Sequence, residues 1–137
     1  KKLLHTQNND QENFILLQKY IDIHKHGDMR VIIYNGKVYR KGLLRFPQKN
    51  DFRANLACGG EFFVKDVPKS MIDHLIIVAE ILLSNGIYFA GIDIIGNHIT
   101  EINITSPTGL VELSNDDNSL LTEIAKDFMR IVDDHKK

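Results

Sequence analysis

The fold is decided by residues 29–45, MRVIIYNGKVYRKGLLR, in which two runs of β-prone residues flank the pair Asn35-Gly36. An Asn-Gly pair between such runs is the strongest short-range indication of a β-hairpin, because both residues accept the positive φ of a tight turn. We therefore predict antiparallel strands over Met29–Tyr34 and Lys37–Arg45. Gly42 in the second arm indicates a bulge.

The segments on either side of this hairpin are less regular. Residues 1–13 are polar and are predicted to form a flexible leader, and the short apolar run of residues 14–17 is predicted to form a buried strand. Residues 47–60 have no apolar period and many turn formers. We expect this long loop to be the least ordered internal segment of the chain.

The remaining sequence predicts two helices around a second hairpin. Ser70–Ser84 and Asn118–Val132 carry apolar residues at helical spacing, with Ser70 expected to cap the first helix and Gly86 to follow its end. Between them, Ile87–Ile95 and His98–Thr105 are predicted strands joined at Gly96-Asn97. The order of elements predicts one α+β domain over residues 14–137, with a largely antiparallel sheet and helices packed on one face.

Composition excludes several classes of protein. The 137 residues are 43% apolar and 26% charged, which is typical of a soluble globular domain, and no apolar stretch is long enough to span a bilayer. A net charge of −1 argues against nucleic acid or membranes as partners. The single cysteine, Cys58, fits a reducing, cytoplasmic location. Because the chain opens at Lys1 without an initiator Met, we expect it to be a fragment.

The second hairpin carries three oxygen-bearing side chains. Glu101 and Asn103 are two residues apart on one strand and so leave the same face, and Asp93 lies on the preceding strand. Carboxylate and amide oxygens on an apolar frame are ligands that a hard divalent cation such as Mg²⁺ prefers. The alternative is that these residues form the solvent face of a half-exposed hairpin. Periodicity alone favours this alternative.

The register of this hairpin decides between the two interpretations. A plain two-residue turn would place Asp93 opposite Thr100 and would send Glu101 to the other face. A shift of one residue, through an odd-length loop over residues 96–98 or a bulge, places Asp93 opposite Glu101 and Gly91 opposite Asn103. We predict the shifted register, in which Gly91 leaves space for phosphate beside Asn103.

Two further groups of residues suggest anion binding. Arg30, Arg45 and Arg53 can bind carboxylates or phosphates in two-point geometry, and the backbone of Gly59-Gly60 can approach a phosphate. Taken singly, each arginine is better explained as a solvated surface residue and the glycine pair as a turn. His24-Lys25-His26 is best explained as a solvated turn.

Several stretches together resemble the prokaryotic glutathione synthetases, a family of ATP-grasp ligases. The resemblance spans about residues 15–115. It favours a metal site over a solvent-exposed face for Asp93, Glu101 and Asn103. The matching segments are Gly27–Val31, Leu44–Gln48, Arg53–Gly60, Gly91–Gly96 and Thr100–Thr108.

The resemblance implies a site and a reaction. The family joins γ-glutamylcysteine to glycine through an acyl phosphate, with ATP converted to ADP and phosphate. By resemblance, Asp93, Glu101 and Asn103 bind Mg²⁺ (with Mn²⁺ as a substitute), and Pro47–Gly60 forms a lid. Nucleotide contacts are implied for the backbone of Gln18, Lys19, Tyr20 and Ile21 with adenine, for Asp28 near the ribose, and for Gly59 and Gly60. Substrate contacts are implied for Arg30, Arg45, Arg53 and Asn55, of which Arg30 and Arg53 are the expected catalytic residues.

The chain also departs from the family. Lys49-Asn50 and Ala54 stand where glycines are common, Cys58 stands for Ala, and Glu61 replaces an Arg, which puts a phosphate contact in doubt. The family's amino-terminal domain and its phosphate-binding lysines have no counterpart in these residues. The isolated chain is therefore expected to be inactive, and its partner to be an amino-terminal half or further copies of itself.

Three alternatives remain open. The first is another ATP-grasp ligase, acting on peptides or D-alanine, although the three arginines together with Ser106-Pro107-Thr108 favour the glutathione type. The second is a magnesium-dependent nuclease, which Asn103 in place of a lysine and the acidic net charge disfavour. The third is a non-catalytic module that binds a nucleotide or a partner chain.

Overall fold

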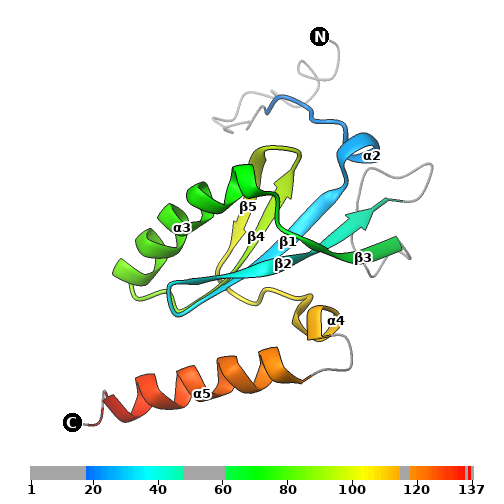
Figure 1. Cartoon of the computed structure of the whole chain (residues 1–137). Helices are drawn as coiled ribbons and strands as arrows, with labels where there is room; N and C mark the ends of the chain where they lie inside the picture. The colour runs from blue at the N-terminus through cyan, green and yellow to red at the C-terminus, as the bar shows by residue number, and fades with distance from the viewer. Residues whose placement is uncertain (1–17, 48–60, 115–117, 135, 137) are drawn as a thin grey trace, which may run out of the picture.

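The computed structural model describes residues 18–47, 61–114, 118–134 and 136. These residues form an α+β domain built on one sheet (Figure 1). Its elements in chain order are α2 (Ile23–His26), β1 (Asp28–Tyr34), β2 (Lys37–Phe46), β3 (Glu61–Asp66), α3 (Lys69–Ser84), β4 (Phe89–Ile95), β5 (His98–Asn103), α4 (Leu110–Ser114) and α5 (Ser119–Asp134).

The sheet is antiparallel throughout, with the strand order β3-β2-β1-β4-β5. The predicted first hairpin is confirmed as β1 and β2, and Asn35 and Gly36 turn between them with φ values of 46° and 71°. The ladder is irregular where Ile32 opposes residues 39–41, so the bulge lies directly before Gly42. The central strand of the sheet is therefore β1, with a neighbour on each side.

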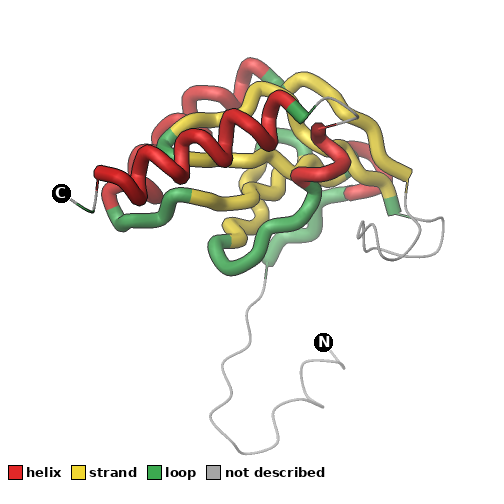
Figure 2. The backbone as a smooth tube through the Cα atoms, turned by 90° about the horizontal axis from the view of Figure 1, so that it is seen from below, coloured by secondary structure: helices red, strands yellow, loops and turns green. Residues whose placement is uncertain are grey.

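Helices cover both faces of the sheet, which corrects the prediction of helices on one face only. Residues Met71, Leu75 and Ala79 of α3 pack on one face, whereas α4 and α5 pack on the other through Leu113, Leu120 and Ile124 (Figure 2). The sequence of β1 explains why both faces are covered, because residues 31–34 are apolar at every position and all are buried. A continuous apolar run is typical of a strand covered on both faces.

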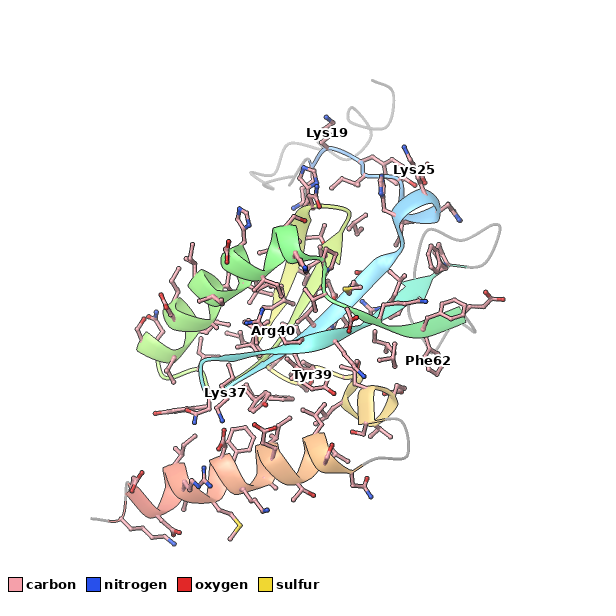
Figure 3. The ribbon with its side chains drawn as sticks, in the orientation of Figure 1. Lys19, Lys25, Lys37, Tyr39, Arg40 and Phe62 are labelled. Carbon is pink, nitrogen blue, oxygen red and sulfur yellow. The ribbon has the colours of Figure 1, made fainter. Side chains whose placement is uncertain are left out.

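An ion pair fixes α5 to the end of the first hairpin. Lys37 follows the β1–β2 turn and extends toward α5, where its Nζ lies 2.6 Å from Oδ2 of the buried Asp127 (Figure 3). The Lys37 ammonium lowers the pKa of the Asp127 carboxyl. Phe89 and Phe128 add an edge-to-face ring contact between the sheet and α5. These contacts hold α5 over its face of the sheet at the Tyr34 end of β1.

The sequence predicted the end of α3 correctly but not the residue that caps its start. Ser70 does not cap the helix, because Pro68 occupies the capping position and makes no side-chain hydrogen bond there. Gly86 follows the helix as predicted, with φ of 74°. Its N–H donates to Leu83 O and that of Ile87 to Leu82 O, which is the Schellman pattern.

Some elements were not foreseen, and some predicted segments lie outside the described residues. Strand β3 is an exposed edge strand in which Phe62 and Phe63 are each 46% exposed, so it lacks a buried alternating pattern. The short helices α2 and α4 were also missed. The predicted leader, the apolar run of residues 14–17 and the loop after Pro47 fall outside the described residues. Within the described part of the chain, no helix is long and apolar enough to cross a bilayer.

Candidate functional site

The predicted shift in the second hairpin is confirmed as a bulge. Gly96 and Asn97 form a two-residue turn, with Ile95 opposite His98 and Ile94 opposite Ile99. Thr100 is then left without an opposite residue, so Asp93 faces Glu101 and Gly91 faces Asn103. The longer loop over residues 96–98 was not needed. A positive φ of 61° at Gly96 is what a two-residue turn with glycine in first place requires.

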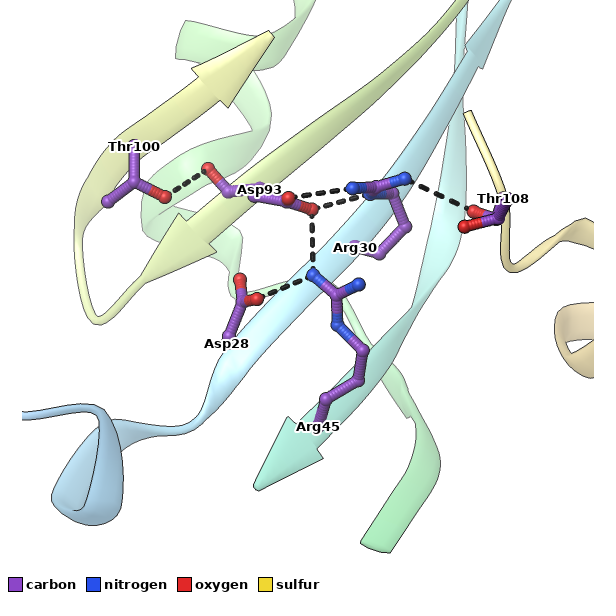
Figure 4. A network of polar contacts seen from close by, with 6 residues as sticks. All are labelled: Asp28, Arg30, Arg45, Asp93, Thr100 and Thr108. Atoms are coloured by element: carbon purple, nitrogen blue, oxygen red, sulfur yellow. Dashed lines mark hydrogen bonds and ion pairs between the residues drawn. The ribbon is translucent and has the colours of Figure 1, made fainter. Parts of the chain in front are cut away.

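The bulge places the three predicted metal ligands on one face of the sheet. Asp93 and the side chains opposite it point away from α3, because Ile92 and Ile94 fill the α3 side. Thr100 Oγ1 donates to the Asp93 backbone carbonyl at 3.2 Å and so ties the bulge to β4 (Figure 4). Glu101 is exposed, Asn103 is half-buried and Asp93 is 5% exposed.

Arg30, on the neighbouring strand, forms a two-point ion pair with the Asp93 carboxylate. Arg30 and Asp93 are directly opposed across β1 and β4. Arg30 donates from Nε to Oδ1 at 2.5 Å and from Nη2 to Oδ2 at 2.7 Å, and its Nη1 donates to Thr108 O at 3.2 Å. This pairing with Asp93 raises the pKa of the Arg30 guanidinium. Arg30 therefore stays charged in a buried position.

Arg45 bridges two carboxylates on the same face. Its Nη2 donates to Asp28 Oδ2 at 2.5 Å and to Asp93 Oδ1 at 3.0 Å (Figure 4). Among the described residues, Asp28 Oδ1 and Arg45 Nε are buried without a hydrogen-bond partner. Burial raises the pKa of Asp28 to about 6, against the opposing effect of Arg45. The four side chains form a buried network of two acids and two arginines.

Gly91 provides room for this network rather than for a ligand. A Cβ atom at Gly91 would lie 2.7 Å from Pro107 Cβ and 2.9 Å from Arg30 Cδ. The space that the sequence suggested for phosphate is thus occupied by Arg30 and Pro107. The absence of a side chain at Gly91 lets the Arg30 stem lie flat across β4 toward Asp93.

A cleft of about 420 Å³ adjoins the bulge. One wall is residues 18–21, the segment expected to contact adenine, and Lys19 lies beside the β4–β5 end of the sheet (Figure 3). The other wall contains His98 and Thr100, which the sequence did not single out. Thr100 is the bulge residue of β5, and no sequence pattern marks that bulge. Asp28, expected near the ribose, does not line the cleft and contacts Arg45 instead.

The donor set fits magnesium better than a transition metal. Within the described residues, no group of three His, Cys, Asp or Glu side chains is arranged to hold a metal ion. Asp93, Glu101 and Asn103 offer two carboxylates and one amide oxygen, which suits a cation that keeps several waters and takes few protein ligands. Asn103 Oδ1 already accepts hydrogen bonds from Thr105 N and Oγ1, which hold the amide in place.

The remaining predicted site residues are not all brought together by the described structure. Arg53, Asn55, Gly59 and Gly60 lie outside the described residues, and so do the departures at Ala54 and Cys58. His24 and His26 belong to α2, whose first turn is capped by Asp22 through the backbone N–H groups of residues 24 and 25. The side chains of residues 24–26 are exposed as predicted, although the backbone forms a short helix instead of a turn.

An α+β domain on an antiparallel sheet, with carboxylate, amide and guanidinium side chains on one face, is consistent with an ATP-grasp domain. Comparison with known proteins agrees, since the model of the prokaryotic glutathione synthetase ATP-grasp domain matches residues 1–118. The chain belongs to this family.

Two curated relatives illustrate the similarity. The glutathione synthetase of Buchnera aphidicola subsp. Schizaphis graminum is 35% identical over 127 residues, covering 93% of this chain and 40% of the relative. That of Wigglesworthia glossinidia brevipalpis is 42% identical over 105 residues, covering 75% of this chain and 33% of the relative. The chain thus spans well under half the length of the relatives it matches.

Proposed function

We propose that this chain carries the nucleotide- and magnesium-binding part of a glutathione synthetase. The whole protein would join γ-glutamylcysteine to glycine through an acyl phosphate, with ATP converted to ADP and phosphate. The observation that carries the proposal is the pairing of Asp93 with Glu101 beside Asn103, on the face that also holds Arg30 and Arg45.

In this proposal, Asp93, Glu101 and Asn103 hold the magnesium ion on one face of the β4–β5 hairpin. Bound magnesium supplies charge neutralisation for the transferred phosphate. Glu101 is exposed on the edge strand and is therefore free to approach a ligand without a change in the backbone. Mn²⁺ is a substitute of similar ligand preference.

The arginines supply orientation. Arg30 and Arg45 come from adjacent strands and both guanidinium groups meet at Asp93. In the proposal, these two positive charges beside the metal ligands attract a carboxylate or phosphate and orient it, which lowers the entropic cost of positioning the reacting groups. Arg53 and Asn55 complete the substrate contacts in the proposal, by resemblance alone.

The nucleotide base is proposed to occupy the cleft between residues 18–21 and the bulge. Residues 18–21 line this cleft and their backbone would contact adenine, while His98 and Thr100 line the opposite side. Because Thr100 also bonds to the Asp93 backbone, base and phosphates would bind to neighbouring parts of one rigid hairpin.

Ligand-dependent unfolding tests the proposal. ATP with Mg²⁺ should raise the melting temperature, because a ligand at about 100 times its Kd adds roughly 2.7 kcal/mol of stability. Glu101→Gln should reduce the shift from ATP with Mg²⁺ more than the shift from ATP alone. Glu80→Gln, an exposed substitution on α3 at the opposite face, is the matched control and should change neither shift. Equal shifts in all three proteins would contradict the metal assignment.

The substrate is tested on the whole protein rather than on these residues alone. Phosphate release should depend on γ-glutamylcysteine and glycine supplied together. A panel of amino acids and D-alanine should give little release. Release with D-alanine instead would favour another ATP-grasp ligase, and no release with any pair would favour a non-catalytic module.

A further inference from the structure

We propose that Asp28 is a positioning residue that receives Arg45 when a divalent cation binds at Asp93. The inference rests on the proposed function, since it takes Asp93 as a cation ligand. It assigns to Asp28 and Arg45 a shared role as an exchangeable ion pair that removes one of the two donors from Oδ1 of the metal-binding carboxylate.

The geometry already places Arg45 between two acceptors. One nitrogen atom, Nη2, serves both Asp28 Oδ2 at 2.5 Å and Asp93 Oδ1 at 3.0 Å. Asp93 Oδ1 also accepts from Arg30 Nε, so this oxygen has two donors while Asp28 Oδ1 has none among the described residues. The donors are therefore distributed unevenly between the two acids.

Two unmet groups point to a second arrangement. Among the residues that the structure describes, Arg45 Nε is a buried donor without an acceptor, and Asp28 Oδ1 is a buried acceptor without a donor. Joining them would complete a two-point pairing through Nε–Oδ1 and Nη2–Oδ2. Arg30 makes this same pairing with Asp93, through Nε to Oδ1 and Nη2 to Oδ2. The exchange would give Arg45 Nε and Asp28 Oδ1 a hydrogen bond to each other. Buried polar groups without a hydrogen bond lower the stability of the fold.

The exchange needs no movement of the backbone. Asp28 and Arg45 are directly opposed across the β1–β2 ladder, so side-chain torsions alone bring the guanidinium onto Asp28. Their side chains are 14% and 7% exposed, which confines Arg45 to the space between the two acids. Burial raises the pKa of Asp28, and the nearby guanidinium of Arg45 opposes this effect.

A cation at Asp93 would supply the driving force. It repels the nearby guanidinium groups and competes with them for the carboxylate oxygens. Arg30 is fixed to both oxygens and to Thr108 O, whereas Arg45 has a single contact with Asp93 and a second acid at hand. Arg45 is thus the arginine that leaves the Asp93 carboxylate, and Asp28 favours this movement because it accepts the Arg45 guanidinium.

The inference predicts a specific pattern of Mn²⁺ affinities. Binding of Mn²⁺ is followed by electron paramagnetic resonance, in the presence of an ATP analogue with a nitrogen bridge between the β- and γ-phosphates. Asp28→Asn should weaken Mn²⁺ binding roughly tenfold, a typical cost of losing a group outside the ligand set. Adding Arg45→Met to that variant should restore the affinity, because the competing guanidinium is gone. Asp73→Asn, exposed on α3, is the matched control and should bind Mn²⁺ normally.

The rescue separates exchange from a merely structural role for Asp28. If Asp28 only held the fold together, the double variant would bind no better than Asp28→Asn, and this result would overturn the inference while leaving the cation site intact. If neither the unmodified chain nor Arg45→Met binds Mn²⁺, the cation site itself fails and the proposed function fails with it.

A second readout follows Arg45 directly. The ¹⁵N signal of the Arg45 Nε–H should shift on addition of Mg²⁺ with the analogue, as this donor gains an acceptor. In Asp28→Asn the shift should be reduced. An Arg45 signal that stays in place while Mg²⁺ binds would also overturn the inference.

Discussion

Asp93 lies directly opposite Glu101 on the neighbouring strand, although the two-residue turn between β4 and β5 would by itself place Asp93 opposite Thr100. The extra residue at Thr100 moves every later side chain of β5 to the other face. Thr100 itself also lines the cleft formed with residues 18–21. One residue therefore sets the register of the acidic face and contributes to one wall of the cleft.

Deletion of Thr100 should separate these two consequences. The ladder would become regular, with Ile94 opposite Ile99 and Asp93 still opposite Glu101, so Mn²⁺ binding should be retained. ATP binding should weaken because the cleft loses part of its wall. Calorimetric titration with each ligand measures both. Loss of Mn²⁺ binding in the deletion variant would show that the bulge has a role beyond register.

Arg30→Met should destabilise the chain by about 3–5 kcal/mol, because it leaves the buried Asp93 carboxylate without its two-point partner. Adding Asp93→Leu should recover part of the loss, since a buried ion pair can often be replaced by apolar residues. Arg40→Met, on the exposed part of β2, is the control and should change stability by less than about 0.5 kcal/mol. Urea unfolding measures all three. Similar losses at Arg30 and Arg40 would contradict the importance of the pair.

The pH dependence of stability should change in Asp28→Asn. The pKa of Asp28 is raised from 3.8 to about 6 in the folded chain, chiefly by burial, so the folded state binds this proton more tightly than the unfolded state. Its contribution to stability is then fully present below pH 3.8 and is lost as the pH rises through about 6. Asn cannot titrate, so the variant should gain about 3 kcal/mol relative to the unmodified chain between about pH 4 and 7.

Unfolding in urea at several pH values between these limits measures that difference. Asp73→Asn is the reference for a carboxylate on the exposed surface and should show no comparable gain. A difference between Asp28→Asn and the unmodified chain that stays constant with pH would mean that Asp28 titrates normally in the folded state.

Local chemistry explains which parts of the fold the sequence could predict. The β1–β2 hairpin and the helix from Lys69 to Ser84 were predictable because a turn pair or a terminal glycine marks their limits. Strand β3 was not, because an exposed edge strand has no need of an apolar face. The prediction of helices on one face was wrong because it used the apolar pattern of the helices alone. The continuous apolar run of residues 31–34, all of which are buried, indicates a strand covered on both faces.

The shared face of Asp93, Glu101 and Asn103 was predicted, but the contacts within it were not. Alternation places Glu101 and Asn103 on one face, whereas the two-residue turn alone would have separated them from Asp93, so the shift in register was predicted from the metal site that the resemblance implies. Nothing in the sequence indicated that Arg30 and Arg45 would both meet Asp93, because that depends on the order of strands in the sheet. The pairing of Asp28 with Arg45 was missed because the irregularity between Val31 and Ile33 changes the register within the first hairpin.

A polypeptide limited to residues 1–137 should not synthesise glutathione at a measurable rate. It spans 33–40% of two glutathione synthetases that it resembles, and binding groups without positioning of both substrates give little acceleration. A coupled assay for ADP with γ-glutamylcysteine and glycine is the measurement. Turnover at rates typical of enzymes would show that these residues alone contain a complete active site.

The central claim is that the face carrying Asp93, Glu101 and Asn103 binds a metal–nucleotide complex. The most direct measurement is paramagnetic broadening of backbone amide signals by sub-stoichiometric Mn²⁺ in the presence of the ATP analogue. The account predicts that the signals of these three residues broaden first, while those of Lys37 and Asp127, at the opposite end of the first hairpin, keep their intensity. Broadening centred on His24 and His26, or equal broadening throughout the chain, would contradict it.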